Sequence, residues 1–292
     1  MRIIRRKAAG MPELPELVVM CEGLNSLVMD RTILSARSYR PGILKTVEPP
    51  LEALQGKRFL SATRRGKHLV LTCSEDLHLV LHLMVAGRLV ICGSETKVTK
   101  ATGFVVTFSD GQDLRLVENG NTKRAKVHVV KRPEDVDWIA EAGPEPLTDA
   151  FRVEVLREAV RGRRQQIKKV ITDQRTVAGI GTAYADEILF TARISPIRYA
   201  STLDEGEVGR LHEAIGSVLS SAIESIRSQS GKTLLAGHER SFLQIYKKSG
   251  QPCPICGERI AEIRYAQKRT YYCPTCQSAG KMLSDRRSWL TR

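Results

Sequence analysis

The sequence predicts an α+β protein in which a β-sandwich with an N-terminal helix precedes a helical domain. Three observations support this prediction. Apolar residues recur at helical spacing over residues 15–29, and short alternating segments follow from residue 32 to about residue 130. Helical spacing returns beyond residue 149, and two close pairs of cysteines lie near the end of the chain. With 292 residues, the chain can bury two separate cores.

The N-terminal half contains eight candidate strands separated by tight turns. They are expected at 33–39, 59–63, 68–73, 77–84, 88–92, 104–108, 114–118 and 126–130. Ser109-Asp110-Gly111 supplies a hairpin turn between two of them. Arg64-Arg65-Gly66-Lys67 forms a second, cationic turn, whose glycine would let the backbone approach a phosphate. An ordinary solvated turn is the alternative interpretation of these four residues.

A stretch with two prolines and a glycine, AGPEPLT at 142–148, predicts a linker between the domains. Helices are expected after it at 149–160, 163–173, 183–191 and 204–227, and Thr202 with Glu205 has capping-box spacing. The expected organisation is a leader, an N-terminal domain, the linker, a helical domain, a cysteine module and a basic tail. Their bounds are 1–10, 11–141, 142–148, 149–246, 247–277 and 278–292.

The formal net charge of +14 indicates a polyanionic partner, because a basic surface binds phosphates with release of counterions. A solvated basic surface without a partner is the alternative. No apolar run has the length of a transmembrane helix, so we expect no membrane partner. The leader carries four cations but lacks the apolar core of a secretory signal. We expect it to be absent from the mature protein, with translation starting at Met11 or processing exposing Pro12.

The stretch Met11-Pro12-Glu13-Leu14-Pro15-Glu16-Leu17 predicts nucleophilic chemistry if Met11 is removed. Pro12 would then be a secondary amine, and an α-amino group with a pKa of about 7.7 to 8.0 is partly neutral near pH 7. Its attack on a sugar C1′ would give a cationic iminium, and Glu13 could donate or accept a proton beside it. The alternative is a plain helix start, in which proline and the two glutamates suit the first turn.

Two glycines spaced by one residue, Gly179 and Gly181, precede a predicted helix. The amides of such a turn can face a phosphate, and the helix dipole adds favourable potential. Lys168, Lys169 and Arg175 lie nearby in the sequence and favour a nucleic-acid backbone as the ligand. A plain helix-turn-helix is the alternative.

The cysteines predict a metal site. Cys253 and Cys256, then Cys273 and Cys276, form two C-x2-C pairs, the spacing of a tetrahedral four-thiolate zinc site. Such a site has no open coordination position, so one structural zinc holding a β-hairpin is expected. Disulfides, or a generic zinc ribbon without a catalytic link, are the alternatives. The three other cysteines are isolated in apolar stretches and are expected to be buried thiols, namely Cys21, Cys73 and Cys92.

These motifs, in this order, resemble the formamidopyrimidine-DNA glycosylase and endonuclease VIII family. The matching segments are MPELPEL at Met11, RRGKHLVL at Arg64, AGPEPL at Ala142, the block from Ile171 to Pro196, and the four-cysteine module. The resemblance implies a β-sandwich, a helix–two-turns–helix domain and a C-terminal zinc β-hairpin finger. It also implies a repair enzyme that binds damaged double-stranded DNA, excises an oxidised base and nicks the strand.

The resemblance assigns roles to particular residues. Pro12 would attack C1′, Glu13 would protonate the opening sugar, and Lys67 would grip a phosphate by the lesion. Glu16 would support the catalytic turn. The resemblance implies DNA contacts at Met84, Lys123, Arg124, Lys168, Gly179, Gly181, Thr182, Lys268 and Arg269. It further implies a monomer that works in the bacterial cytoplasm, associated with the nucleoid, or otherwise inside the cell.

The chain departs from the family pattern where that family recognises its lesion. The position of the family's intercalating methionine is Val85, with Met84 beside it as a substitute, and the aromatic wedge is replaced by Lys123-Arg124-Ala125-Lys126. Thr182 stands for an asparagine and Lys268 for a finger arginine, whose bidentate fork lysine does not reproduce. The segment 232–246 is shorter than the region that forms the 8-oxoguanine-capping loop. We therefore expect the chemistry at the sugar to be intact and lesion recognition to be altered.

Three functions follow from these observations. The first is a bifunctional DNA glycosylase and abasic-site lyase, acting through a proline iminium by β/δ-elimination, with a lean toward oxidised pyrimidines, ring-opened purines or abasic sites. The second is a non-catalytic binder of damaged or abasic DNA, which the altered wedge residues and the leader favour. The third is a zinc-ribbon RNA or chromatin adaptor, which does not account for the family segments.

Overall fold

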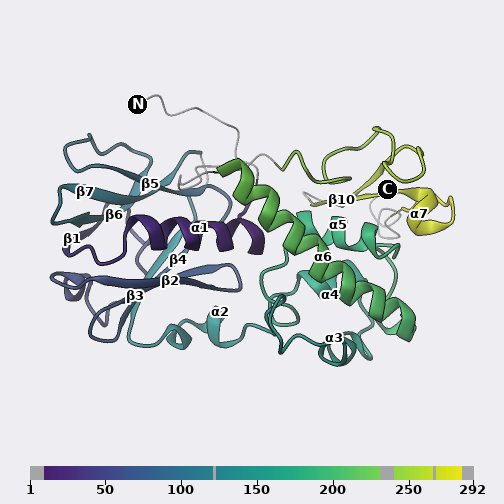
Figure 1. Ribbon diagram of the computed structural model, residues 1–292, viewed down its shortest axis with the longest axis horizontal. Coiled ribbons are helices and arrows are strands. Elements are labelled where there is room, and N and C mark those ends of the chain that lie inside the picture. The colour runs from purple at the N-terminus through teal and green to yellow at the C-terminus, as the bar shows by residue number, and fades with distance from the viewer. Residues whose placement is uncertain (1–9, 121–122, 231–239, 266–267, 285–292) are drawn as a thin grey trace. The chain divides into compact units, whose positions relative to one another are not determined.

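The computed structural model describes residues 10–120, 123–230, 240–265 and 268–284. The chain forms two compact units (Figure 1). The first comprises residues 1–141 together with 223–240, and the second comprises residues 142–222 and 241–292. The long helix α6, Glu205–Ser230, therefore contributes residues to both units.

The first unit is a β-sandwich of two four-stranded antiparallel sheets. One sheet has the order β1-β6-β7-β5 and the other the order β2-β3-β4-β8. The strands are β1 (Ile33–Ser38), β2 (Phe59–Arg65), β3 (His68–Cys73), β4 (Leu77–His82), β5 (Gly87–Gly93), β6 (Thr102–Phe108), β7 (Gln112–Glu118) and β8 (Lys126–Val130). All eight strands thus form where the alternating pattern predicts them, with ends that differ by at most two residues.

One hydrophobic core fills the space between the sheets and helix α1, Leu14–Leu27. The face of α1 that carries Leu17, Met20 and Leu24 packs into this core, as the helical spacing predicts. Figure 1 shows α1 running beside β2, and the Asn25 side chain fixes this contact by accepting from the Ala62 N–H and donating to the Ala62 carbonyl, both at 2.8 Å. The helix is therefore fixed to the sandwich near its C-terminal end.

Two of the three isolated cysteines are buried thiols. Burial raises the pKa of Cys21 to about 12 and that of Cys73 to about 12, so both remain protonated at neutral pH. Cys92 is only half-buried on β5, which corrects the prediction for that residue. It lies toward the end of its strand, where the four residues Val90–Gly93 are all partly exposed.

The second unit contains short helices and a two-stranded hairpin. The helices are α3 (Val153–Val160), α4 (Ile167–Thr172), α5 (Thr182–Thr191), the first part of α6, and α7 (Pro274–Ser278). The hairpin pairs β9 (Ala261–Tyr265) with β10 (Lys268–Tyr272). Helix α5 is buried along almost its whole length and contacts both β10 and α7, so it forms the centre of this unit.

Two helices of the second unit are shorter than predicted: α3 begins at Val153 rather than residue 149, and tertiary hydrogen bonds shorten α4. Helix α4 begins at Ile167 rather than residue 163, since the backbone of 163–167 pairs with the segment 198–201. Helix α6 begins at Glu205, and its capping bonds join Asp204 and Glu207 at 2.8 and 3.0 Å. The expected capping box of Thr202 with Glu205 is therefore wrong; Thr202 instead lies in a short 3-10 turn, Ala200–Thr202.

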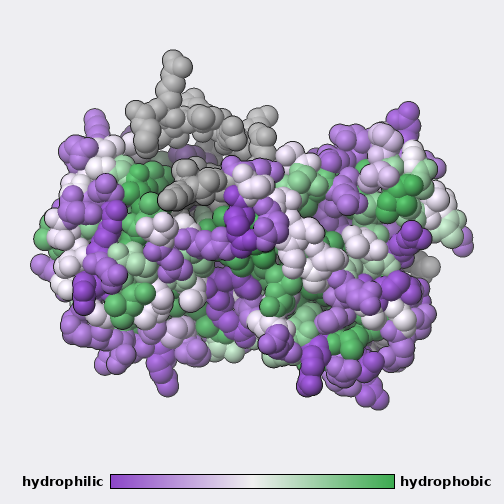
Figure 2. Space-filling view, in the orientation of Figure 1, coloured by the Kyte–Doolittle hydropathy of each residue, from purple (hydrophilic) through white to green (hydrophobic). Residues whose placement is uncertain are grey.

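Three short elements were not predicted from the sequence. They are the 3-10 turns Leu51–Leu54 and Pro133–Asp135 and the one-turn helix α2, Asp137–Ala140. Among the described residues, none of the helices is long and apolar enough to cross a membrane. On the face drawn in Figure 2, hydrophilic residues are widespread and hydrophobic residues form patches between them.

Candidate active site and metal centre

The first candidate site is the turn that leads into α1. Glu13 is the N-cap of this helix, and its N–H donates to Glu16 Oε2 at 2.9 Å. Pro12 and both glutamates are buried, and each glutamate is only 3% exposed. The turn is a helix start, as the structural interpretation requires, but that interpretation does not explain two buried carboxylates. A buried charge is costly unless it is paired.

Arg240 supplies the missing positive charge. Its Nε lies 2.7 Å from Glu16 Oε1, its Nη1 lies 3.6 Å from Glu13 Oε1, and its Nη2 donates to the Met11 carbonyl at 3.0 Å. The Arg240 side chain is only 6% exposed. Sequence reasoning missed this residue, which lies 224 positions from Glu16 and belongs to no motif. The sequence offered one indirect signal for Arg240: two glutamates, if they are buried, need a nearby cation.

Lys67 joins the same cluster from the turn between β2 and β3. Burial is the main cause that lowers its pKa below the ordinary lysine value. Glu13 and Glu16 act in the opposite direction, and Arg240 adds to the lowering. Lys67 is therefore within electrostatic range of both carboxylates and of the arginine. The structure thus brings together Pro12, Glu13, Glu16 and Lys67, which the sequence proposed separately.

The loop between β4 and β5 is held in a fixed conformation. The ring of His82 accepts the Met84 N–H through Nδ1 at 3.2 Å, and Met84 has a left-handed backbone with φ of 53°. Arg88 donates to the carbonyls of Val85 and Gly87 at 3.2 and 2.6 Å. Val85 is 53% exposed, whereas Met84 is half-buried, so exposure favours Val85 as the side chain that this loop presents.

Lys123 and Arg124 follow the pair of residues 121–122, which lies outside the described part of the chain. Both side chains are exposed. The backbone N–H groups of Arg124 and Ala125 donate to the buried Glu118 carboxylate at 2.7 and 2.9 Å, and Glu118 also pairs with Arg40. The cationic segment therefore starts from an anchored backbone.

In the second unit, Gln174 organises the glycine turn. Its Oε1 accepts the Gly179 N–H at 2.9 Å, and its Nε2 donates to the carbonyls of Thr172 and Ile180. Gly179 has a φ of 85°, which favours glycine at this position. Gly181 is the N-cap of α5 and is buried, while Thr182 begins the helix and is exposed. The Gly179 N–H already binds a partner inside the protein. The exposed helix start at Thr182 is therefore better placed than Gly179 to contact a phosphate.

Lys168 is buried, and its ammonium group binds inside the second unit. It lies 2.6 Å from Asp186 Oδ1 and donates to Thr270 Oγ1 at 2.8 Å and to the Arg269 carbonyl at 3.2 Å. Asp186 also accepts the Tyr271 N–H at 3.2 Å. Lys168 therefore connects α4 to α5 and to β10, a role that the sequence interpretation did not foresee. Neither did it foresee Asp186 or Gln174.

Helix α5 also anchors the segment that leads into the cysteine module. The Glu187 carboxylate accepts the N–H groups of Gln244, Ile245 and Tyr246 at 2.8 to 2.9 Å. Burial raises the Glu187 pKa, and these three donors oppose that rise. Asp186 and Glu187, which are consecutive residues of α5, thus fix the hairpin and the segment before it. Arg269 is exposed on β10, where its position pairs with that of Arg264, and Lys268 pairs with Tyr265 at the end of the strand.

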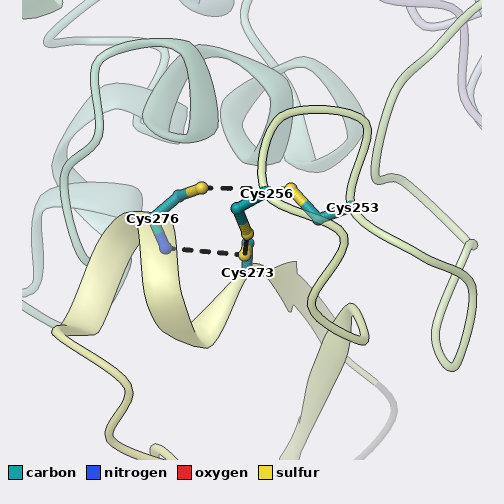
Figure 3. Close-up of side chains that lie close together, drawn as sticks. All are labelled: Cys253, Cys256, Cys273 and Cys276. Carbon is teal, nitrogen blue, oxygen red and sulfur yellow. Dashed lines mark hydrogen bonds between the residues drawn. The ribbon is translucent and has the colours of Figure 1, made fainter.

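The four cysteines of the two C-x2-C pairs converge at one point, as Figure 3 shows. Cys253 and Cys256 come from the loop before the hairpin, Cys273 follows β10, and Cys276 lies on α7. Their sulfur atoms all lie within 4.8 Å of one another, with 3.9 Å between Cys253 and Cys276 and 3.4 Å between Cys256 and Cys273. Tetrahedral Zn–S bonds of about 2.3 Å place sulfurs roughly 3.8 Å apart. The donor set and its spacing therefore fit a zinc ion.

Comparisons with known proteins find similar domains along most of the chain. Models of three domain families match the chain: the formamidopyrimidine-DNA glycosylase N-terminal domain at 11–124, the formamidopyrimidine-DNA glycosylase H2TH domain at 142–233, and a zinc finger found in FPG and IleRS at 250–279. The formamidopyrimidine-DNA glycosylase of Desulforamulus reducens is 36% identical over 277 residues, which cover 92% of this chain and 100% of that protein.

Solved structures show the same similarity. The Lactococcus lactis enzyme in complex with DNA containing an abasic site has a TM-score of 0.81 at 28% identity, covering 91% of this chain and 99% of that one. A variant of the same enzyme bound to DNA containing Fapy-dG has a TM-score of 0.82 at 28% identity, covering 91% and 100%. With its β-sandwich, its H2TH domain and its zinc-finger module, this chain belongs to the formamidopyrimidine-DNA glycosylase family.

Proposed function

We propose that the protein is a DNA repair glycosylase with abasic-site lyase activity, and that the Pro12 nitrogen is its nucleophile. The observation that carries the proposal is the cluster around Pro12, in which the buried side chains of Glu13, Glu16 and Arg240 interact with the half-buried Lys67. A helix start needs none of these groups to be buried, whereas acid–base chemistry at a sugar needs a carboxyl group with restricted access to water. The relatives named above act on damaged DNA or were crystallised with it.

In the proposed reaction, the Pro12 nitrogen forms a bond to C1′ as the bond from C1′ to the damaged base breaks. The base leaves with the bonding electron pair and takes up a proton. Glu13 donates a proton to the ring oxygen, the sugar opens, and the product is an iminium between Pro12 and C1′. The iminium acidifies the C2′–H bond, so loss of that proton expels the 3′ phosphate and nicks the strand. A second elimination expels the 5′ phosphate.

This chemistry requires Pro12 to be an amine. While Met11 is attached, the Pro12 nitrogen is a tertiary amide, and its lone pair is delocalised into a planar peptide bond. We therefore propose that the active protein begins at Pro12. Residues 1–9 lie outside the described residues, and the proposal rests on the chemistry of the amide alone.

Cationic side chains and loop residues suit a duplex partner. Lys67 would hold a phosphate near the lesion, and the loop with Met84 and Val85 would enter the space that the flipped nucleotide leaves. Lys123, Arg124, Thr182, Lys268 and Arg269 would contact the backbone. Lys168 and Gly179 would support the binding surface from within, because their polar groups already bind Asp186 and Gln174. We expect the protein to act as a monomer wherever cellular DNA is accessible.

The lesion preference follows from the departures from the family pattern. The absence of an aromatic wedge beside Arg124 argues against strong discrimination of the opposite base. The short segment 232–246 would cap 8-oxoguanine, and its residues 232–239 lie outside the described part of the chain. We propose a preference for oxidised pyrimidines, ring-opened purines or pre-existing abasic sites. Faster excision of 8-oxoguanine opposite cytosine than of any other lesion in a panel would contradict it.

We also propose that the four cysteines hold one structural zinc. With four thiolates the ion has no open position for substrate, so it would stabilise the hairpin that carries Arg269. A metal assay is expected to give one equivalent of zinc per chain. Cys273→Ser should lose the metal and the fold of the hairpin, whereas Cys92→Ser, which removes a thiol outside the cluster, should keep both. Unchanged zinc content in Cys273→Ser would contradict the assignment.

Borohydride trapping tests the catalytic proposal. Reduction turns an iminium into a stable amine, so a protein that begins at Pro12 should form an irreversible crosslink with abasic DNA. Peptide mapping should place the crosslink at Pro12. The alternative function, a non-catalytic binder of damaged DNA, is favoured by the altered loop at Val85 and the absent wedge. Tight, salt-sensitive binding without any crosslink would establish that alternative instead.

A further inference from the structure

Arg240 lies where a positive charge can act on the Pro12 nitrogen itself. Its Nη2 donates to the Met11 carbonyl at 3.0 Å. The oxygen and nitrogen of one planar peptide group are about 2.3 Å apart, so Nη2 lies at most about 5.3 Å from the Pro12 nitrogen. Removal of Met11 takes away this carbonyl, while the contacts of Arg240 to Glu13 and Glu16 remain available.

The guanidinium group is also held firmly. It is buried against two carboxylates that are themselves buried, and its planar fork addresses three acceptors in different directions. The contacts tie Glu16 Oε1 to Arg240 while Glu16 Oε2 accepts the Glu13 N–H. One arginine therefore fixes the backbone of the N-cap residue and lies beside its carboxyl group.

We propose that Arg240 is the positioning residue of this site: it orients Glu13 through Glu16 and sets a positive charge beside the Pro12 nitrogen that keeps this nitrogen neutral and nucleophilic. The inference rests on the proposed function of Pro12. A cation beside an amine disfavours its protonated form, which lowers its pKa, and a charge within about 6 Å commonly changes a pKa by one to three units. Within the described part of the chain, the charged groups that interact with this turn include two anions and three cations. They are Glu13, Glu16, Lys67, Arg88 and Arg240.

The opposing effects of these groups show why Arg240 matters. Glu13 and Glu16 alone would raise the pKa of the amine and leave it protonated at neutral pH. Arg88 also keeps its charge, and its Nη1 donates to the carbonyls of Val85 and Gly87. Burial lowers the pKa of Lys67. Arg240 contributes a charge that persists at every relevant pH, since a guanidinium group is not deprotonated in proteins.

The test is a pH titration of the Pro12 amine by NMR in the full chain beginning at Pro12, labelled with 13C and 15N at proline. Arg240→Gln should raise the pKa of this amine by about one unit or more. The matched control is Arg227→Gln, which also removes an arginine that binds α1, through Glu22, but at a distance from Pro12 along the helix. The control should leave the amine unchanged. An unchanged pKa in Arg240→Gln would overturn the proposal.

A kinetic arm separates charge from orientation. Borohydride trapping of abasic DNA should show the same upward shift of its pH midpoint in Arg240→Gln. Arg240→Lys keeps the charge but cannot address three acceptors, so its amine pKa should stay within about half a unit of the wild type while base excision falls at least tenfold at every pH. If Arg240→Gln does not fold, Arg240→Lys decides, and excision at the wild-type rate would overturn the proposal.

The two arms fail differently. If Arg240→Gln raises the pKa of the amine but the wild-type protein forms no crosslink, the proposed lyase function is refuted and the inference about Arg240 stands. If the wild-type protein crosslinks through Pro12 but Arg240→Gln leaves the pKa of the amine unchanged, the inference is refuted and the proposed function stands.

Discussion

At the scale of single residues, the N-terminal turn concentrates charge where a helix start needs little. Glu13 and Glu16 are buried beside Lys67 and Arg240, and Glu16 binds both the Glu13 N–H and Arg240. Under the proposed function, Glu13 would act on the substrate and Glu16 would hold the turn, which divides the roles of the two carboxyl groups.

Glu13→Gln tests this division. An amide cannot donate a proton as a carboxylic acid does, so excision of an intact damaged base should slow by about 100-fold or more. Trapping on a preformed abasic site should fall far less, because that sugar opens to the aldehyde without help. Single-turnover gel assays on the two substrates measure both rates. Equal losses on the two substrates would show that Glu13 serves the amine and not the sugar.

Buried histidines predict how stability depends on pH. Burial is the main cause that lowers the pKa of His68 to about 3 and of His82 to about 4, and their rings lie 4.5 Å apart. In the unfolded chain both groups titrate near 6.5. Between pH 6.5 and pH 4 the unfolded state therefore binds more protons, so the free energy of unfolding falls as the pH falls.

Each histidine should lower the free energy of unfolding by at most about 2 kcal/mol between pH 7 and pH 5. Urea unfolding at several pH values measures this slope. A double variant, His68→Gln with His82→Gln, should be less stable at pH 7 but show a flatter dependence on pH. A slope in the double variant equal to that of the wild type would mean that other groups cause the acid sensitivity.

At the scale of elements, the loop between β4 and β5 is shaped by its own backbone. A Cβ atom added at Gly87 would lie 2.3 Å from the Leu83 carbonyl oxygen, which no side-chain movement can relieve. His82 and Arg88 hold the same loop from both sides. The loop is therefore preformed, and the exposed Val85 at its tip does not depend on DNA for its position.

Gly87→Ala should destabilise the first unit by about 1–3 kcal/mol, because the added methyl group forces the backbone apart. It should also weaken binding to an abasic-site duplex more than binding to intact duplex. Gly216→Ala is the control: its Cβ meets open space on α6, and alanine in a helix should be neutral or slightly stabilising. Thermal unfolding and titration with labelled DNA measure both effects. Equal behaviour of the two variants would contradict a preformed loop.

The sequence was informative where structure is local and weak where structure depends on distant contacts. Period-two alternation located all eight sandwich strands, and β3 and β8 have the predicted bounds. Helix α4 was predicted too long, because pairing of 163–167 with 198–201 is a tertiary effect that residue spacing does not encode. The same limit applies to the sites. The cysteine spacing predicted a convergent cluster, whereas Arg240 and Gln174 became visible only through the polar groups they satisfy.

At the scale of the whole molecule, the net charge of +14 and the basic loops suit DNA as the partner. Binding to duplex DNA should weaken steeply with added salt, since each phosphate contact releases a counterion. Catalysis should depend instead on whether the Pro12 nitrogen is an amine or an amide. Binding and chemistry are therefore separable, and the leader offers a way to separate them.

The most direct measurement compares two proteins on abasic DNA under borohydride. One begins at Pro12; the other retains residues 1–10 and carries Met11→Leu, so that translation cannot begin at position 11, with its mass verified. The first should crosslink, and the second should not, because its Pro12 nitrogen stays an amide. Both should bind the duplex in a salt-sensitive manner. Equal crosslinking by the two proteins would contradict Pro12 as the nucleophile and direct attention to Lys67.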